Sequence, residues 1–416
     1  MRVGLFSPMG TGNLGDASTQ DAVIFNLKKR LPDIEIYGFS LNTEDTAIRH
    51  GIQGFPISRI HWEHSSPSGN KVSPFRAALE NNKFVRVFRR LFLRVPQELI
   101  FNIQAFRRVR KLNLVIFSGS GQLADEWKKA DKHSYSILRW TLLARIAGVP
   151  VLFISVGAGP ITSSRNRRFI KWALSMAKYR SFRDIESYQY MAAIGFDRSD
   201  PIVPDMAHSI SDVDIYRKHR SESGNIVVGI SPMAYSAPGL WYIQDNEAYY
   251  VYLNRLAEFI NWLKNNRAEI VLFPSAVPSD SYVINDLRKL YREKFGSTLN
   301  DDQNQVQTVT DLLSKISTVD IVIASRFHGI LLPFVLYKPV IALSYHPKDV
   351  SLMKDMGQEK YCLNIEKFDV HSLIGCFQSI RQNITKVRNH IIDRENEYRK
   401  LLDRQYEIVI ALCSQK

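Results

Sequence analysis

The hydrophobic and polar positions of the first half of the chain predict repeated strand–loop–helix units. Short apolar runs rich in β-branched residues are typical of strands that are buried on both faces of a parallel sheet. Most of these runs are followed by a longer segment in which apolar residues recur at helical spacing. The predicted strands lie at 2–7, 34–39, 114–117, 151–156 and 179–182. This alternation predicts an α/β fold with a doubly wound sheet.

The second half repeats the pattern after a polar, turn-rich segment at 201–223, which we interpret as a linker. Its predicted strands lie at 226–230, 270–274, 307–309, 320–324 and 340–343. We therefore expect a Rossmann-like domain at 1–210, a second Rossmann-like domain at 224–386 and a C-terminal helix at 387–416. The two domains should face each other across a central cleft, because open α/β sheets bind ligands at the carboxyl ends of their strands.

Length and composition narrow the class of protein. A chain of 416 residues with 45% hydrophobic and 23% charged residues suits a soluble globular protein with two cores. Its apolar runs fall short of the roughly 18 residues of a membrane-spanning helix, and its start resembles a strand rather than a signal peptide. The three cysteines lack metal-site spacing, so we expect reduced thiols, no metal and a cytoplasmic location.

Positive charge is concentrated in an insertion at about 58–111. Its part from 71 to 111 holds eleven Lys and Arg residues against Glu80 and Glu98, a net charge of +9. Residues 84–95 place arginines largely on one helical face and apolar residues on the other, which favours contact with an anionic membrane surface. The alternative is a scaffold helix with a solvated charged face. Nucleic-acid binding is not expected, since no recognised module is present.

The segment 320–348 carries the clearest chemistry. A predicted strand at 320–324 is followed at once by Ser325, Arg326 and His328, and then by an apolar helix. Polar side chains at this place would be costly to bury without partners. An Arg supplies a planar fork for a carboxylate or phosphate, and a His moves protons near neutral pH. We expect half of an active site here; the alternative is an Arg that caps strand carbonyls and a His satisfied in the core.

Three glycine-rich loops follow strands of the first domain, at 10–16, 118–121 and 155–160. Tight turns need glycine in any case, but three such loops along one sheet edge favour a ligand pressed against the backbone. The first loop opens a helix, and a helix N-terminus attracts anions. Asp16 at the end of this loop is either the helix N-cap or a proton donor or hydroxyl ligand.

Two further cations follow predicted strands. Arg183 comes directly after the strand at 179–182, where the alternative is a surface Arg paired with a neighbouring acid. Lys348 closes the segment Tyr345-His346-Pro347-Lys348, beyond the strand at 340–343, and could hold a phosphate as a point charge.

Together these motifs resemble the polysaccharide pyruvyl transferase family, from the first loop to about Lys348. The matching elements are Gly12-Asn13-Leu14-Gly15-Asp16, Gly157-Ala158-Gly159-Pro160, Ser181-Phe182-Arg183-Asp184, Ser325-Arg326-Phe327-His328 with Pro339, and Tyr345-His346-Pro347-Lys348. The chain departs from the family pattern at Phe327, where Leu is usual, at His346, where an acid is common, and at 118–121, where a longer glycine run is typical. The resemblance implies a GT-B-like arrangement of the two domains.

Members of that family move the pyruvyl group of phosphoenolpyruvate onto two hydroxyls of a sugar, forming a cyclic ketal and releasing phosphate. The resemblance implies that Arg183 and Arg326, assisted by Lys348, bind the carboxylate and phosphate of this donor. His328 and Asp16 would share the acid and base roles. Further substrate-binding candidates are Asn13, Gly15, Gly121, Gly157, Gly159, Ser325 and Tyr345. We expect no cofactor besides phosphoenolpyruvate as donor, and a lipid-linked or nucleotide-linked sugar as acceptor.

Two other functions stay open at this point. GT-B glycosyltransferases with a nucleotide-sugar donor often carry two Glu at a characteristic spacing in the second domain, which Glu359 and Glu366 do not match. A non-catalytic anion- or lipid-binding protein at the membrane surface would bind without releasing phosphate. The acceptor sugar, the ketal stereochemistry and the oligomeric state do not follow from the sequence.

Overall fold

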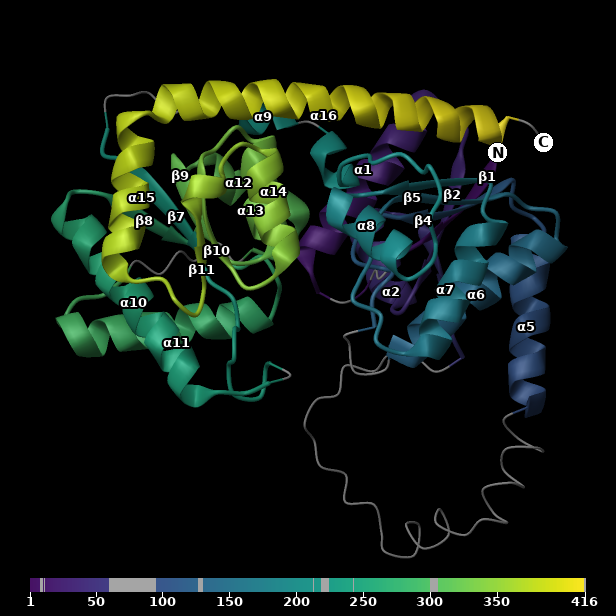
Figure 1. Ribbon diagram of the computed structural model, residues 1–416, viewed down its shortest axis with the longest axis horizontal. Helices are drawn as coiled ribbons and strands as arrows, with labels where there is room; N and C mark the ends of the chain where they lie inside the picture. Colours follow the sequence, from purple (N-terminus) through teal and green to yellow (C-terminus); the bar gives the residue numbers. More distant parts are fainter. Residues whose placement is uncertain are drawn as a thin grey trace, which may run out of the picture.

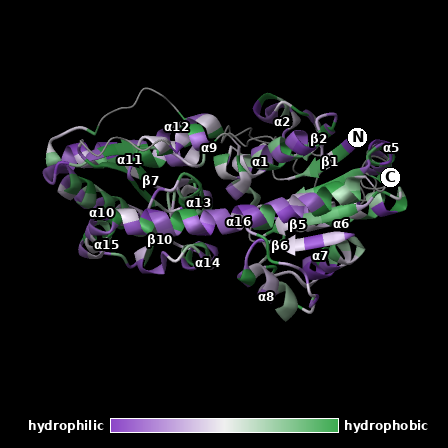
Figure 2. Cartoon of the chain, turned by 90° about the horizontal axis from the view of Figure 1, so that it is seen from above, coloured by the Kyte–Doolittle hydropathy of each residue, from purple (hydrophilic) through white to green (hydrophobic). Residues whose placement is uncertain are grey.

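The computed structural model describes residues 1–7, 10, 12–59, 95–125, 130–211, 213–217, 224–241, 243–299 and 306–414. They form two lobes, each a parallel β-sheet covered by helices, and the long helix α16 (Ile384–Cys413) lies across both lobes (Figures 1 and 2). Both termini lie at the outer end of the N-terminal lobe (Figure 1). The predicted α/β class with two doubly wound sheets is confirmed.

The N-terminal lobe contains a six-stranded sheet in the order β3-β2-β1-β4-β5-β6, with every neighbouring pair parallel. Its strands are β1 (Arg2–Phe6), β2 (Glu35–Ser40), β3 (Gln53–Pro56), β4 (Leu114–Ser118), β5 (Val151–Val156) and β6 (Tyr179–Phe182). The strand order reverses between β1 and β4. The glycine-rich loops after these two strands therefore flank the switch point, where open α/β sheets bind ligands.

The C-terminal lobe contains a five-stranded parallel sheet in the order β11-β10-β9-β7-β8. Its strands are β7 (Val227–Ser231), β8 (Glu269–Leu272), β9 (Ile321–Ala324), β10 (Val340–Ser344) and β11 (Cys362–Asn364). The switch point lies between β7 and β9, so the segment after β9, with Arg326 and His328, starts at the ligand-binding edge.

Helices pack on both sheets. In the N-terminal lobe they are α1 (Leu14–Arg30), α2 (Thr43–His50), α5 (Val95–Val109), α6 (Ala130–Ile146), α7 (Ser164–Met176) and α8 (Ile185–Ala193). The connection and the C-terminal lobe contain η2 (Met206–Ser209), α9 (Val213–Tyr216), α10 (Asn246–Asn265), α11 (Ser279–Phe295), α12 (Val309–Ser317), α13 (Phe327–Val335), α14 (Pro347–Asp355), η3 (Glu359–Tyr361) and α15 (Val370–Gln382). In the described part of the chain, no helix has the length and apolar content to cross a bilayer.

The structure differs from the sequence-based strand predictions in three places. The strand predicted at 307–309 is wrong, because Thr308 caps α12 and forms a capping box with Asp311. This local hydrogen bonding outweighs a short apolar alternation. The edge strands β3 and β11 were not predicted, because β3 contains a Gly and a Pro among its four residues and β11 has only three residues. The helix predicted at 84–95, except its last residue, and most of the insertion at 58–111 lie outside the described residues.

The helix predicted at 387–416 belongs to both cores. Its first half places Val387, Ile391 and Tyr398 in the apolar core of the C-terminal lobe. Its second half places Leu402 and Tyr406 in a core cluster of the N-terminal lobe. α16 therefore connects the lobes through buried apolar contacts.

Candidate active site

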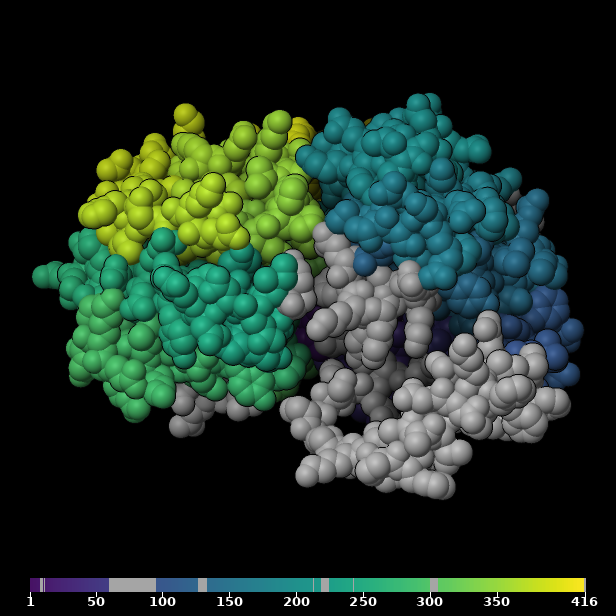
Figure 3. Space-filling model, turned by 60° about the horizontal axis from the view of Figure 1, so that its bottom comes forward, coloured from purple at the N-terminus to yellow at the C-terminus, as the bar shows by residue number. Residues whose placement is uncertain are grey.

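The two lobes meet directly (Figure 3), and the N-terminal glycine loop is part of the contact. Asn13 forms an antiparallel bridge with Ala276, and the Val277 N–H donates to the Gly12 carbonyl at 3.0 Å. Gly12 has a φ of 76°, and a Cβ there would lie 2.2 Å from the Val277 carbonyl oxygen. Only glycine fits this position, so Gly12 serves the contact between the lobes.

His328 reaches from α13 to the N-terminal lobe. Its Nε2 lies 3.2 Å from the Thr19 hydroxyl of α1 and 3.8 Å from Asp205 Oδ2. Its side chain is only 9% exposed, and the Gly15 backbone packs against it so closely that a Cβ on Gly15 would lie 2.3 Å from the imidazole. His328 and Gly15, both predicted as site residues, are therefore in direct contact.

Asp205 is the carboxylate that faces this imidazole, and it was not predicted. It is the N-cap of η2, where it accepts the Ala207 N–H at 3.0 Å, and it also accepts the Thr19 hydroxyl at 3.1 Å. Burial by itself raises the pKa of Asp205, but the nearby imidazole of His328 and the charge of Arg183 outweigh burial and hold its pKa well below the usual range. Asp205 is therefore ionised, and it can stabilise a protonated His328.

Arg183 lies on the other side of Asp205. Its Nη1 donates to Asp205 at 3.3 Å, its Nε donates to Asp184 at 3.1 Å, and its guanidinium stacks on the Phe327 ring at 4.1 Å. Burial lowers the pKa of Arg183, but the two carboxylates outweigh burial and raise it. Gly157 leaves room for the guanidinium, since a Cβ there would lie 2.9 Å from Nη2. Arg183 is thus buried and not on the surface, although it pairs with the neighbouring Asp184 as the alternative interpretation expected.

Arg326 lies at the N-cap of α13 and binds a different acid. Its Nε and Nη2 donate to both oxygens of Asp280 at 2.7–2.9 Å, and Nη2 also donates to the Ser279 hydroxyl at 3.2 Å. Asp280 is fully buried and also accepts the N–H groups of Ser275 and Ala276. Because Ala276 pairs with the N-terminal glycine loop, the Arg326–Asp280 ion pair is connected to the interface between the lobes.

Asp16 lies in the first turn of α1 and is not its N-cap. Asn13 caps the helix by accepting the Gly15 N–H at 3.0 Å. The Asp16 carboxylate accepts Asn13 Nδ2 at 2.9 Å and the Ser120 hydroxyl at 2.8 Å, which joins the loops after β1 and β4. The N-cap interpretation of Asp16 is therefore wrong, and its carboxylate stands at the switch point of the N-terminal sheet.

The other predicted glycines have different neighbours. A Cβ on Gly159 would lie 2.8 Å from the Tyr190 ring, so this glycine, like Gly15 and Gly157, is required by a protein side chain. Gly121 has no heavy atom within 4 Å of an ideal Cβ and borders open space. Protein side chains explain the other glycines. Among these predicted glycines, Gly121 therefore stays the candidate for a ligand pressed against the backbone.

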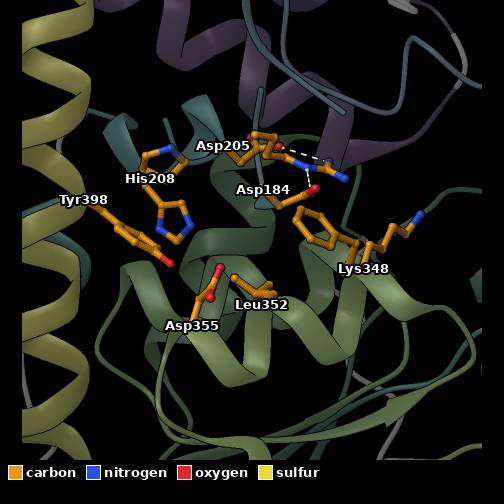
Figure 4. A pocket seen from close by; sticks show the side chains of 10 residues that line it. Asp184, Asp205, His208, Lys348, Leu352, Asp355 and Tyr398 are labelled. Atoms are coloured by element: carbon orange, nitrogen blue, oxygen red, sulfur yellow. Dashed lines mark hydrogen bonds and ion pairs between the residues drawn. The ribbon is translucent and has the colours of Figure 1, made fainter. Parts of the chain in front are cut away.

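A small solvent-connected cavity lies between Arg183 and α16 (Figure 4). It is lined by Arg183, Asp184, Pro204, Asp205, His208, Phe327, Lys348, Leu352, Asp355 and Tyr398. His208 stacks edge-on with Tyr398 at 4.9 Å and binds the buried Glu395 at 2.8 Å. Among the described residues that line the cavity, Arg183 and Lys348 are predicted donor ligands, whereas Arg326 is absent. The structure thus brings Arg183 and Lys348 together and keeps Arg326 outside this cavity.

The remaining candidates lie at the carboxyl edge of the C-terminal sheet. The Ser325 hydroxyl is 3.2 Å from the hydroxyl of the buried Tyr252. Tyr345 packs with Trp241 at 5.5 Å and with Tyr235 at 6.2 Å, and the Lys348 ammonium lies 6.0 Å from the Tyr345 ring centre. Ser325, next to Arg326, thus contacts a buried tyrosine hydroxyl, and Tyr345 belongs to an aromatic cluster at the same sheet edge.

The sequence reasoning missed Asp205 and Asp280, which hold the imidazole and the second guanidinium. Asp205 falls in the segment interpreted as a linker, although Pro204-Asp205 before a short helical turn is a usable N-cap signal. Asp280 sits near the start of a helix, where an acid has an ordinary capping explanation. Their partners are far away in sequence, so local patterns do not reveal them.

The whole cluster around His328 lies within the part of the chain that matches a known family model. The model of the polysaccharide pyruvyl transferase family matches residues 13–347. The chain belongs to this family. The comparison with curated proteins gave no match.

Solved structures with a similar fold are nucleotide-sugar enzymes and a glycosyltransferase. A glycosyltransferase from Rickettsia africae has a TM-score of 0.57 and 10% identity over 100% of this chain and 99% of that one. A UDP-N-acetylglucosamine 2-epimerase from Rickettsia bellii has a TM-score of 0.54 and 12% identity over 99% of this chain and 97% of that one. The UDP-GlcNAc 2-epimerase from Neisseria meningitidis, bound to UDP-GlcNAc, has a TM-score of 0.51 and 12% identity over 98% of this chain and 100% of that one. At such identities the likeness shows the GT-B fold alone.

The arrangement provides proton transfer and anion binding. Within the described residues, no group of three or more His, Cys, Asp and Glu is placed to hold a metal ion. The imidazole of His328, held between a hydroxyl and an ionised carboxylate, can take up and release a proton. The adjacent guanidinium of Arg183 can bind an anion at the same place.

Proposed function

We propose that this family member transfers the pyruvyl group of phosphoenolpyruvate to two hydroxyls of a sugar, forming a cyclic ketal and releasing phosphate. The observation that carries the proposal is the approach of His328 from one lobe to Asp205 of the other, directly beside Arg183. The reaction needs proton transfer next to an anion site, and this cluster supplies both. Membership of the family supports the choice of reaction.

The proposed donor is an anion with a carboxylate and a phosphate, and we propose two guanidinium groups as its ligands. Arg183 uses Nε and Nη1, and Arg326 uses Nε and Nη2, to bind buried aspartates. Among the described residues, neither Arg183 Nη2 nor Arg326 Nη1 has a hydrogen-bond partner. Arg183 lines the cavity and Arg326 does not. We assign Arg183, with Lys348 assisting, to one anionic group of the donor and Arg326 to the other. The aspartates fix the guanidiniums in place, which lowers the entropic cost of binding.

The reaction balances with two proton transfers. Protonation of C3 converts the CH₂ of the donor into a methyl group and makes C2 electrophilic. One sugar hydroxyl adds to C2, and the second displaces phosphate as the C2–O bond to phosphorus breaks. One hydroxyl proton restores the proton given to C3, and the other leaves with phosphate. We assign these transfers to His328 and Asp16, while Asp205 stabilises the imidazolium form of His328.

The acceptor is proposed to be a sugar of a surface polysaccharide precursor, carried on a lipid or a nucleotide. The protein would then work in the cytoplasm at the inner face of the cell membrane. Support comes from the net charge of +9 between residues 71 and 111, which attracts anionic headgroups and pyrophosphates.

The test is phosphate release from phosphoenolpyruvate with a panel of lipid-linked and nucleotide-linked sugars, combined with the mass of the ketal product. His328→Ala and Asp205→Asn should each lower the rate by about 10²-fold or more, whereas the exposed His371→Ala serves as a control. Near-normal turnover by His328→Ala would remove this residue from the mechanism. Thermal stabilisation by nucleotide sugars but not by phosphoenolpyruvate would instead favour a glycosyltransferase.

A further inference from the structure

Helix α5 has two apolar faces, of which only one is used for packing. Phe101, Ala105 and Val109 are buried against the N-terminal lobe, where the Phe101 ring meets Trp140 edge-on at 6.2 Å. Glu98, on the same side, binds Arg139 and a second Arg of that lobe. This inner face accounts for the position of the helix.

The outer face of α5 is also apolar. Val95, Leu99, Ile100 and Ile103 have exposed fractions of 52%, 60%, 55% and 44%. Residues 95, 99 and 103 follow one another at helical i, i+4 spacing, so they form one stripe, and residue 100 lies next to it. Single exposed apolar residues are common on protein surfaces, but four on one helix face require an explanation.

The stripe continues into basic residues. Arg107 occupies the next i+4 position, and Arg110 and Lys111 follow at the end of the helix, all three exposed. Arg108, in contrast, packs over the Phe55 ring at 4.7 Å and belongs to the lobe. An apolar face with arginines and lysine at one end is the pattern of a helix that lies in the interface of an anionic membrane.

The position of α5 at the outer end of the molecule would let a flat membrane surface reach it. α5 lies at the outer end of the N-terminal lobe, away from the C-terminal lobe, in both views (Figures 1 and 2). A bilayer that contacts α5 would therefore approach from the side opposite to the C-terminal lobe. The contact would leave the cavity beside Arg183 uncovered.

We propose that the outer face of α5 is a membrane-docking surface that inserts Leu99, Ile100 and Ile103 among anionic lipids, with Arg107, Arg110 and Lys111 at the headgroups. The sequence pointed to the basic stretch 71–111 with its predicted helix at 84–95, and α5 lies in the part of that stretch that the structure describes. The inference rests on the proposed location at the membrane but not on the proposed chemistry. Binding to vesicles and release of phosphate are separate measurements, so each can fail alone.

The experiment is sedimentation of the full-length protein with phosphatidylcholine vesicles, with and without phosphatidylglycerol. The wild type should bind the anionic vesicles and dissociate at high salt. Leu99→Gln with Ile103→Gln should weaken binding about tenfold, because less apolar surface is then buried in the bilayer. Arg107→Gln with Arg110→Gln should weaken it about thirtyfold, from two lost headgroup contacts.

Matched controls come from exposed residues elsewhere. Ile48→Gln changes an apolar residue that is 80% exposed on α2, and Arg292→Gln with Arg381→Gln removes the same charge from the C-terminal lobe. Both controls should bind like the wild type. The proposal is overturned if the wild type does not bind anionic vesicles or if the Leu99/Ile103 variant binds normally. A lower melting temperature of that variant, or a loss of self-association, would show that the face is covered by this chain or by a second copy.

Discussion

Replacing Gly15 with alanine should displace the imidazole of His328. An ideal Cβ on Gly15 would lie 2.3 Å from Cβ, Cγ and Nδ1 of His328, whereas real Cβ atoms essentially never come closer than 3.0 Å. The ring therefore has to move by roughly 1 Å. Its Nε2 now lies 3.2 Å from the Thr19 hydroxyl and 3.8 Å from Asp205, and such a shift breaks both contacts.

The expected result is a large loss of rate with a moderate loss of stability. Misplacement of a catalytic group by about 1 Å costs on the order of 10²-fold in rate, and overpacking of a buried contact costs about 1–3 kcal/mol. Phosphate release at saturating phosphoenolpyruvate measures the first effect, and thermal unfolding measures the second. Gly375→Ala is the control, since no heavy atom lies within 4 Å of its Cβ position. Turnover of Gly15→Ala close to that of the control would refute the role of this contact.

Two further predictions concern buried charges. Asp280→Asn removes the acid that orients Arg326, so the KM for phosphoenolpyruvate should rise about tenfold or more, as expected for a charged hydrogen bond; an unchanged KM would separate Arg326 from donor binding. Burial, together with the charge of Arg388, lowers the pKa of Lys338 to about 8. The unfolded chain keeps this proton up to about pH 10.4. The free energy of unfolding should therefore rise between pH 8 and 10. Lys338→Met should lack this rise in chemical denaturation, and an equal rise in both proteins would contradict the assignment.

Much of the fold was predictable from local patterns. β4, β5, β9 and β10 are buried on both faces, so their sequences are continuous apolar runs that are hard to mistake. The glycine loop before α1 and the polar residues after β9 mark strand ends, and topology then places them at the ligand-binding edges. The edge strand β11 has only three residues and escaped detection because it shows no period.

The candidate site was predictable only in part. His328, Arg183 and Asp16 are polar residues directly beyond strands or loops, where their positions are conspicuous. Arg183 pairs with the adjacent Asp184, but the other partners did not show in the sequence because they are distant along the chain. Thr19 and His328 are 309 positions apart, and Asp16 and Ser120 are 104 apart.

The sequence by itself determined the α/β class, the division into two sheets and the side chains that stand at their carboxyl edges, because these depend on local periodicity and on turn chemistry. Only the tertiary structure decided that Asp205 faces His328, that Asp280 holds Arg326, and that α16 joins both cores. These contacts join groups that are far apart in the sequence. Each ion pair offsets the cost of burying its charges, and α16 contributes buried apolar surface; both depend on distances that no local pattern encodes.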